Sequence, residues 1–463
     1  TPARMKNPAC KFDFFGRLPF VNKNIRPFVR FFAFFLAFVP VVLLANTFLI
    51  QTDTFVALTM DELKTREDIE LAVVGSSIVR DHFNAALISE QTGMQAFSAA
   101  VPGLSLQGEL ALTRELYRKN DPEYTVLVVE PYNFDTAKED PNALYKLMPF
   151  LSDAENKLTY YLDTSREDGQ YLDRLLMFRE FGAESLADVF KTIGLRLNPQ
   201  KEYERLKPTM DATVAYAGGG FLRHTSGESA ESLIRETVLR EEYPGYVYEL
   251  YAPSKALLAR YKALCAEKGS KLLVILSPNL TAHALAEPGF LPYGESLMAY
   301  CRENEIPCYN FQYAKTEWLP NLDGYYYDLY HMNGNGADLF SAAFAAFFNA
   351  YVRGEDVSSW FYADSAEYLA SIDRITNVWL TLQDSQFVAD CNRGTLVTPL
   401  YRFVSVAADG SETLLRDYSE NAVFFAADVP TGETLRVYAV PQGQENADSV
   451  WYDFSKRSPR VES

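Results

Sequence analysis

Short apolar runs alternate with segments of helical spacing through the middle of the chain. The runs are rich in Val, Ile and Leu, and five of them predict buried strands at 69–74, 95–99, 124–129, 271–276 and 307–311. Apolar positions recur every three or four residues between and after them, which predicts helices at 81–92, 107–119, 251–268, 293–304 and 337–352. This alternation is typical of the α/β class, in which helices cover both faces of a parallel sheet.

The alternation stops between about residues 135 and 249. This stretch is charged, contains Leu and Tyr at helical spacing, and predicts a helical insertion after the third strand. It either overhangs the functional site as a lid or substrate platform, or packs beside the sheet as an appendage, and the sequence does not favour one over the other. Gly218-Gly219-Gly220 indicates a flexible or tightly turning segment within it.

A β-rich pattern takes over after about residue 354. Strands are expected at 396–406, 412–415, 421–427 and 434–440, with turn residues between them. This pattern predicts a small β-sandwich, similar to the Ig-like modules of surface proteins, that holds glycan or a partner protein.

Residues 31–50 are apolar except for Asn46 and Thr47. As a helix this run is long enough to cross a hydrocarbon core of about 30 Å, and Pro40 is tolerated in such a helix. A cleaved signal peptide or a buried core helix are the alternatives, but the run is longer than a usual signal sequence and no small-residue cleavage site follows it. We therefore expect a retained single-pass membrane anchor.

Basic and acidic residues are distributed unequally on the two sides of this apolar run. The chain has 43 basic and 61 acidic residues; seven of the bases and one of the acids precede residue 31, which leaves 36 bases and 60 acids, a net charge of −24, beyond it. The positive-inside rule then predicts a cytoplasmic N-terminus at 1–30, the transmembrane helix at 31–50, and extracytoplasmic domains at 51–353 and 354–463. An acidic outer domain also makes nucleic acid an improbable partner.

The cysteines give no framework for a disulfide-rich fold or a metal site. The five are Cys10, Cys265, Cys301, Cys308 and Cys391, and their spacing resembles no metal motif. Mostly buried thiols are the favoured interpretation, with a bridge among the last four left open. With only four histidines in the chain, we expect neither a metal nor a cofactor.

Two short motifs carry the candidate chemistry. Gly75-Ser76-Ser77 closes the first predicted strand, and Asp328-Leu329-Tyr330-His331 lies just before the last predicted helix of the α/β region. A serine hydroxyl is a poor nucleophile near neutral pH and needs a base, itself oriented by a carboxylate. Each motif alone is more often structural, as a helix cap or a surface pair, but the conjunction predicts a catalytic triad of Ser77, His331 and Asp328.

The order of these motifs resembles the SGNH (GDSL-type) hydrolase superfamily, and within it the membrane-anchored, DltD-like O-acyltransferases and their relatives in polysaccharide acetylation. The likeness covers about residues 28–353 without the insertion. It implies a flavodoxin-like parallel sheet of the SGNH type, Ser77 as nucleophile, Asp328 and His331 as the dyad, and Gly103 as an oxyanion donor.

Two positions depart from the pattern of that superfamily. Asn133 follows the third strand but lacks the usual Gly-x-Asn-Asp context, so it either completes the oxyanion hole or caps the following helix. Ser76 stands where the hydrolases usually have Asp, which suits the anchored acyltransferases better and makes Ser76 a minor alternative nucleophile.

The resemblance implies an extracytoplasmic serine O-acyltransferase that passes an acyl group, D-alanyl or acetyl, through Ser77 to a cell-envelope glycopolymer such as teichoic acid. It also implies a membrane partner of the MBOAT type that delivers the acyl unit. Two alternatives stay open: an SGNH esterase that removes acyl groups with the same residues, and a non-catalytic envelope scaffold or glycan-binding protein.

Overall fold

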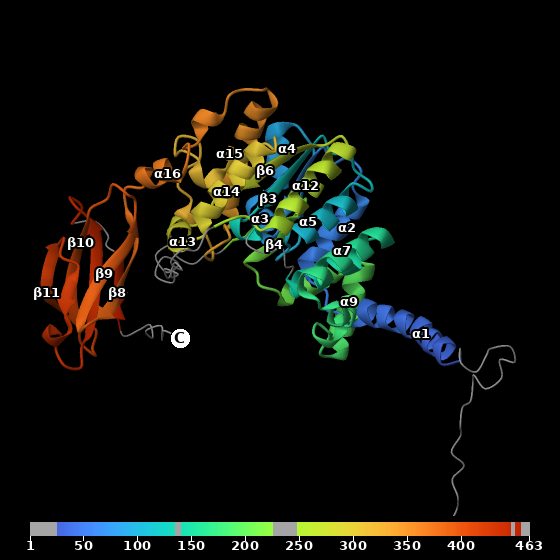
Figure 1. The fold of residues 1–463 in the computed structure, drawn as a ribbon, viewed down its shortest axis with the longest axis horizontal. Coiled ribbons are helices and arrows are strands. Elements are labelled where there is room, and N and C mark those ends of the chain that lie inside the picture. The colour runs from blue at the N-terminus through green and yellow to red at the C-terminus, as the bar shows by residue number, and fades with distance from the viewer. Residues whose placement is uncertain (1–25, 135–139, 226–247, 446–449, 455–463) are drawn as a thin grey trace, which may run out of the picture.

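A computed structural model describes residues 26–134, 140–225, 248–445 and 450–454. Most of the basic N-terminus predicted at 1–30 therefore lies outside the described residues, as does Cys10. The long apolar helix α1 and a C-terminal β domain lie at opposite ends of the molecule, with an α/β domain between them (Figure 1).

A five-stranded parallel sheet forms the centre of the α/β domain. Its order is β2-β1-β3-β6-β7, and its strands are β1 (Leu71–Gly75), β2 (Ala96–Ala100), β3 (Tyr124–Val129), β6 (Lys271–Leu276) and β7 (Cys308–Asn310). The predicted parallel sheet is confirmed, with every strand within two residues of its predicted bounds. The strand order reverses between β1 and β3, and ligands bind at such a switch point in doubly wound sheets.

Helices cover both faces of this sheet. Along β1, Ala72 and Val74 join one buried cluster while Leu71 and Val73 join another, as the two-residue period of a strand requires. The first cluster is covered mainly by α2 (Thr54–Thr65), α5 (Leu106–Leu116), α12 (Ala252–Glu267) and α14 (Phe290–Glu303). The second is covered mainly by α3 (Ser77–His82), α4 (Ala85–Thr92) and α15 (Gly334–Val352).

Two helices differ from the prediction. The single helix expected at 81–92 is two helices, because the Asn84 side chain accepts from the Leu87 N–H and begins α4 anew. The short helix α13 (Thr281–Ala286) was not predicted. Its six residues are too few to display a helical period.

The insertion after β3 is not wholly helical. It contains α6 (Pro141–Leu147), α7 (Ala154–Asp168), α8 (Tyr171–Leu175), α9 (Leu186–Leu197) and α10 (Pro199–Leu206), followed by a hairpin of β4 (Val214–Gly218) and β5 (Phe221–His224). The three glycines 218–220 all have positive φ and form the hairpin tip. The tip docks on β2, where Ser98 N–H donates to Gly219 O at 2.8 Å.

Helix α1 spans Arg26–Leu49, so it begins and ends earlier than the run predicted at 31–50. Its most apolar part, Pro27–Asn46, is 20 residues long and almost wholly unburied. By length and composition this is a candidate membrane anchor or signal sequence. Ile50 lies outside the helix and is buried against the folded domain.

In the C-terminal region predicted at 354–463, η7 (Ser358–Trp360) and α16 (Ser365–Ser371) precede the first strand, β8. Two antiparallel sheets, β12-β9-β8 and β11-β10-β13-β14, share one hydrophobic cluster. The strands are β8 (Ile375–Gln383), β9 (Gln386–Arg393), β10 (Pro399–Val406), β11 (Glu412–Ser419), β12 (Val423–Phe425), β13 (Thr434–Pro441) and β14 (Val450–Asp453). Arg374 joins this domain to the α/β domain through an ion pair with Asp323.

Candidate active site

Ser77 lies at the carboxyl end of β1, on the turn into α3. The turn needs glycine at position 75, since a Cβ there would lie 2.6 Å from Val79 Cγ2 and 2.8 Å from Val128 O. Ser76 caps α3 by accepting from the Ile78 N–H. This arrangement leaves Ser77 as the first residue of the helix, with a half-buried side chain.

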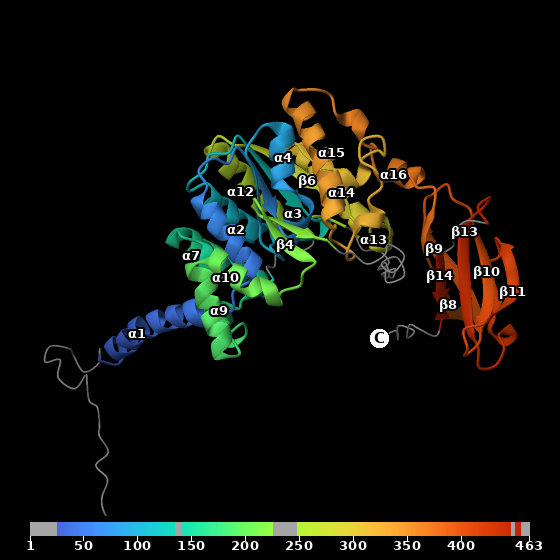
Figure 2. The ribbon, with the colours of Figure 1, turned by 180° about the vertical axis from the view of Figure 1, so that it is seen from behind.

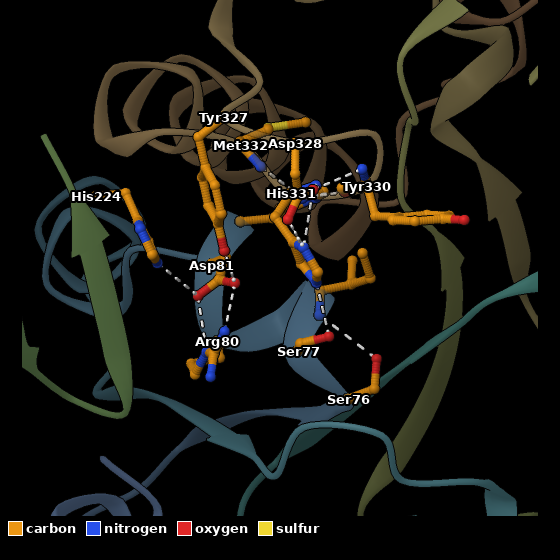
Figure 3. Close-up of polar contacts among 12 residues, drawn as sticks. Ser76, Ser77, Arg80, Asp81, His224, Tyr327, Asp328, Tyr330, His331 and Met332 are labelled. Carbon is orange, nitrogen blue, oxygen red and sulfur yellow. Dashed lines mark hydrogen bonds and ion pairs between the residues drawn. The ribbon is translucent and has the colours of Figure 1, made fainter. Parts of the chain in front are cut away.

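His331 and Asp328 meet Ser77 from the loop before α15 (Figure 3). His331 Nε2 lies 2.8 Å from Ser77 Oγ, and His331 Nδ1 lies 2.8 Å from Asp328 Oδ2. The Asp328 carboxylate is itself held by the backbone N–H groups of Tyr330 and His331. The structure therefore brings together the three residues that the sequence predicted, although 254 positions separate the serine from the histidine.

This geometry fixes the tautomer of His331. An ionised carboxylate can only accept, so Nδ1 carries the proton toward Asp328 and Nε2 presents its lone pair to Ser77 Oγ. Burial alone would lower the pKa of His331, but the hydrogen bond to Asp328 and the charge of Asp81 outweigh it and raise that pKa. Burial alone would raise the pKa of Asp328, but the hydrogen bond and charge of His331 keep it below its ordinary value. His331 is therefore a general base, and the ionised Asp328 carboxylate orients it.

Ser76, the alternative nucleophile, faces a different partner. Its hydroxyl lies 3.5 Å from Glu130 Oε1, at the end of β3. Burial raises the pKa of the Glu130 carboxyl. Among the described contacts, His331 bonds the hydroxyl of Ser77 and not that of Ser76. Glu130 was not singled out from the sequence, although it directly follows a buried strand.

Gly103 and Asn133 lie after β2 and β3, at the same edge of the sheet as Ser77. Gly103 has φ of +81° and follows Pro102 in a tight turn that Leu104 N–H closes onto Val101 O. Asn133 Oδ1 accepts from the Glu130 N–H at 2.7 Å, so the side chain caps the short turn η1 (Pro131–Phe134). No hydrogen bond within the described residues joins Gly103 or Asn133 to Ser77, and an oxyanion role for either stays a prediction.

A second polar cluster lies beside His331 and includes two residues of α3, the helix that begins with Ser77 (Figure 3). The buried Asp81 pairs with Arg80 through two 2.8 Å bonds and accepts from Tyr327 Oη at 2.9 Å. The Tyr327 ring stacks between His331 and His224, with centroid distances of 5.7 and 3.9 Å (Figure 3). His224 is the last residue of β5, so the insertion reaches the shell of the site through its hairpin.

His82 braces the loop that carries His331. Its Nε2 lies 3.1 Å from the Met332 backbone N and its Nδ1 lies 2.8 Å from Ser277 Oγ. The same Nε2 lies 3.1 Å from Tyr330 O, so the loop offers this nitrogen both a donor and an acceptor. Burial, with the nearby His331, lowers the pKa of His82 to about 3.

In the described part of the chain, no group of three or more His, Cys, Asp or Glu gathers at metal-binding geometry. The four described cysteines, at 265, 301, 308 and 391, are free thiols. Comparison with known proteins finds no matching family model and no significantly similar curated protein. The case for function therefore rests on the geometry of the site.

Proposed function

We propose that this chain is an extracytoplasmic serine O-acyltransferase that acts on a cell-envelope glycopolymer through an acyl-Ser77 intermediate. One observation carries the proposal: Ser77 Oγ, His331 and the Asp328 carboxylate are linked by two consecutive 2.8 Å hydrogen bonds. That linkage is the arrangement by which a serine becomes nucleophilic near neutral pH.

In the first half of the reaction, Ser77 Oγ attacks the acyl carbonyl carbon while its proton passes to His331 Nε2. The tetrahedral oxyanion is stabilised by the backbone N–H groups of Ser77 and Gly103, with the Asn133 amide as a further donor. The bond to the leaving group then breaks, and His331 returns the proton to that group. Asp328 stays ionised and stabilises the imidazolium.

In the second half, a hydroxyl of the glycopolymer takes the place of the leaving group. His331 Nε2 removes its proton, the acceptor oxygen attacks the Ser77 ester, and the proton returns to Ser77 Oγ. The acyl group, D-alanyl or acetyl, ends on the polymer. The same steps with water as acceptor describe an esterase, so transfer requires that the acceptor be held where water would otherwise react.

The anchor supports an envelope location. An exposed apolar helix of this length is suited to the bilayer, and the basic residues at and before its start favour a cytoplasmic N-terminus under the positive-inside rule. A soluble acyl donor has no evident binding segment in the sequence. We therefore propose an MBOAT-type membrane partner as the source of the acyl unit, and we expect the β domain to contact glycan or protein.

A fluorophosphonate probe tests the nucleophile. The full-length protein in detergent should be labelled, Ser77→Ala should lose the label entirely, and Ser76→Ala should keep it. Unchanged labelling of Ser77→Ala would move the nucleophile elsewhere, and an unlabelled wild-type protein would favour the scaffold alternative. Release of acyl groups to water at the same rate with and without a glycan acceptor would favour the esterase.

A further inference from the structure

Helix α9 turns its apolar side away from the protein. Leu186, Phe190 and Leu197 are 77, 70 and 82 % exposed, and the half-buried Ile193 lies between them. Their spacing of four, three and four residues places all four on one face of the helix. The side that packs inward includes the polar Thr192 along with Leu195. A helix at a water-facing surface instead buries its apolar face and exposes its polar face.

Hydrogen bonds fix α9 to the point where α1 enters the folded domain. Arg196 Nη2 donates to Ile50 O at 3.0 Å and Arg196 Nε donates to Thr52 Oγ1 at 2.9 Å. At the other end of α9, the Ala183 N–H donates to Leu49 O. Both views show α9 lying across the end of α1 rather than alongside it (Figures 1 and 2).

The preceding helix α8 is also held against α1. Asn46 Nδ2 donates to Leu175 O at 2.9 Å, which ties the last residue of α8 to the last turns of α1. Tyr171 and Leu172 of this helix are 45 and 61 % exposed. Tyrosine is enriched at the level of lipid headgroups, where one end of its ring is apolar and the other is wet.

The length of α1 sets the depth at which these helices lie. Its apolar part ends at Asn46, and 20 helical residues span about 30 Å, the thickness of the hydrocarbon core. Residues 46–52, which hold α8 and α9, therefore lie at the boundary between acyl chains and headgroups. An outward apolar stripe at that level faces lipid.

We propose that α9, together with α8, is an interfacial membrane helix embedded in the outer leaflet. It gives the α/β domain a second attachment beside α1 and thereby fixes the height and tilt of the domain over the bilayer. The inference goes beyond the proposed chemistry and shares with it only the membrane anchor. A membrane protein, or a second copy of this chain, is the competing occupant of the stripe.

Quenching by brominated lipid tests the proposal on the full-length protein in liposomes. Phe190→Trp places a fluorophore in the stripe, and Leu396→Trp places one at an equally exposed apolar position of the β domain, where Leu396 is 79 % exposed. Subtracting the wild-type signal removes the four native tryptophans. Lipid brominated in the acyl chain should reduce the added emission of Phe190→Trp by roughly twofold or more and leave that of Leu396→Trp unchanged, as burial among acyl chains requires.

Equal quenching of the two variants, or none in either, would overturn the proposal. So would crosslinking of a photoreactive residue at position 190 to protein instead of lipid, which would identify a partner or a second copy as the occupant. Fluorophosphonate labelling of Ser77 in both variants reports the active site independently. Failure of the membrane proposal and failure of the catalytic one are therefore distinguishable.

Discussion

Two serine–histidine pairs lie at the carboxyl edge of the same sheet. Ser77 and His331 are 2.8 Å apart, as are Ser277 and His82. In the first pair a carboxylate takes the proton of Nδ1, and a lone pair faces the serine. In the second pair Nε2 lies 3.1 Å from both the Met332 backbone N and Tyr330 O, and no hydrogen bond among the described residues joins the His82 ring to a carboxylate. The two pairs therefore share a contact distance and differ in whether a carboxylate holds the far ring nitrogen.

The pKa directions follow from the same difference. His82 is buried and His331 is half-buried, and burial disfavours the charged imidazolium. Asp328 and Asp81 outweigh that cost at His331, whose pKa rises, whereas the pKa of His82 falls to about 3. His331 can accept and hold a proton during a reaction, while His82 stays neutral and supports the loop.

Removing the carboxylate should produce the largest effect, because it makes His331 resemble His82. We expect Asp328→Asn to slow fluorophosphonate labelling by about 10,000-fold, since the amide no longer enforces the tautomer that presents a lone pair to Ser77. The residual labelling of Asp328→Asn should persist to lower pH than that of wild type. Without Asp328 the pKa of His331 falls, so the ring stays deprotonated in more acidic solution. Asp384→Asn, at an exposed turn of the β domain, is the matched control and should leave the rate unchanged. A loss below tenfold for Asp328→Asn would contradict the assigned role.

Lowering the pH should have the next largest effect, because His82 and His331 change the free energy of unfolding in opposite directions. Below pH 6.5 the unfolded chain protonates His82 while the folded chain does not, so the free energy of unfolding falls by roughly 2 kcal/mol between pH 6.5 and 5 through this residue. His331, whose pKa is raised, contributes stability that is present below pH 6.5 and lost as pH rises through its folded pKa.

Urea unfolding in detergent at pH 6.5 and 5 measures this contrast. His82→Gln keeps an acceptor for Met332 N–H and should lower stability at pH 6.5 by roughly 1–3 kcal/mol, but it should flatten the acid dependence. His331→Gln should make the loss of stability between pH 6.5 and 5 larger than in wild type. The same acid dependence in wild type and His82→Gln would show that His82 is not held neutral.

Ser277→Ala should have the smallest effect. His82 Nδ1 loses its buried hydrogen-bond partner, which costs roughly 1–2 kcal/mol. Fluorophosphonate labelling should stay within about twofold of wild type, because His82, with a pKa of about 3, is too weak a base to activate Ser277. Loss of labelling in this variant would reverse the assignment of the two pairs.

The sequence was most informative where a local pattern decides the structure. Apolar runs that end in small or polar residues marked the five parallel strands, and the Asp-x-x-His spacing was enough to expect the contact of Asp328 with His331. It was least informative where the partner is distant in the chain. The brace formed by His82 joins residues 195 and 250 positions away, and no local pattern reports such contacts.

Other parts of the structure were predicted only in part from the local sequence. The glycines 218–220 indicated a turn, but the hairpin they close depends on docking against Ser98. Strands β8 and β9 escaped prediction because polar residues interrupt their alternation, as in Thr376-Asn377 and Asp390-Cys391-Asn392-Arg393. Asn133 does not cap the helix that follows, because Asp140 caps α6; its side chain reaches back to the Glu130 N–H, and its oxyanion role stays a prediction.

The distance in sequence between Ser77 and His331 also sets the order in which the protein acquires reactivity. A ribosome completes the nucleophile turn early, and more than half of the chain must follow before its base exists. Until then Ser77 is an ordinary alcohol. A nascent chain therefore lacks the base that would activate this serine until its fold is nearly complete.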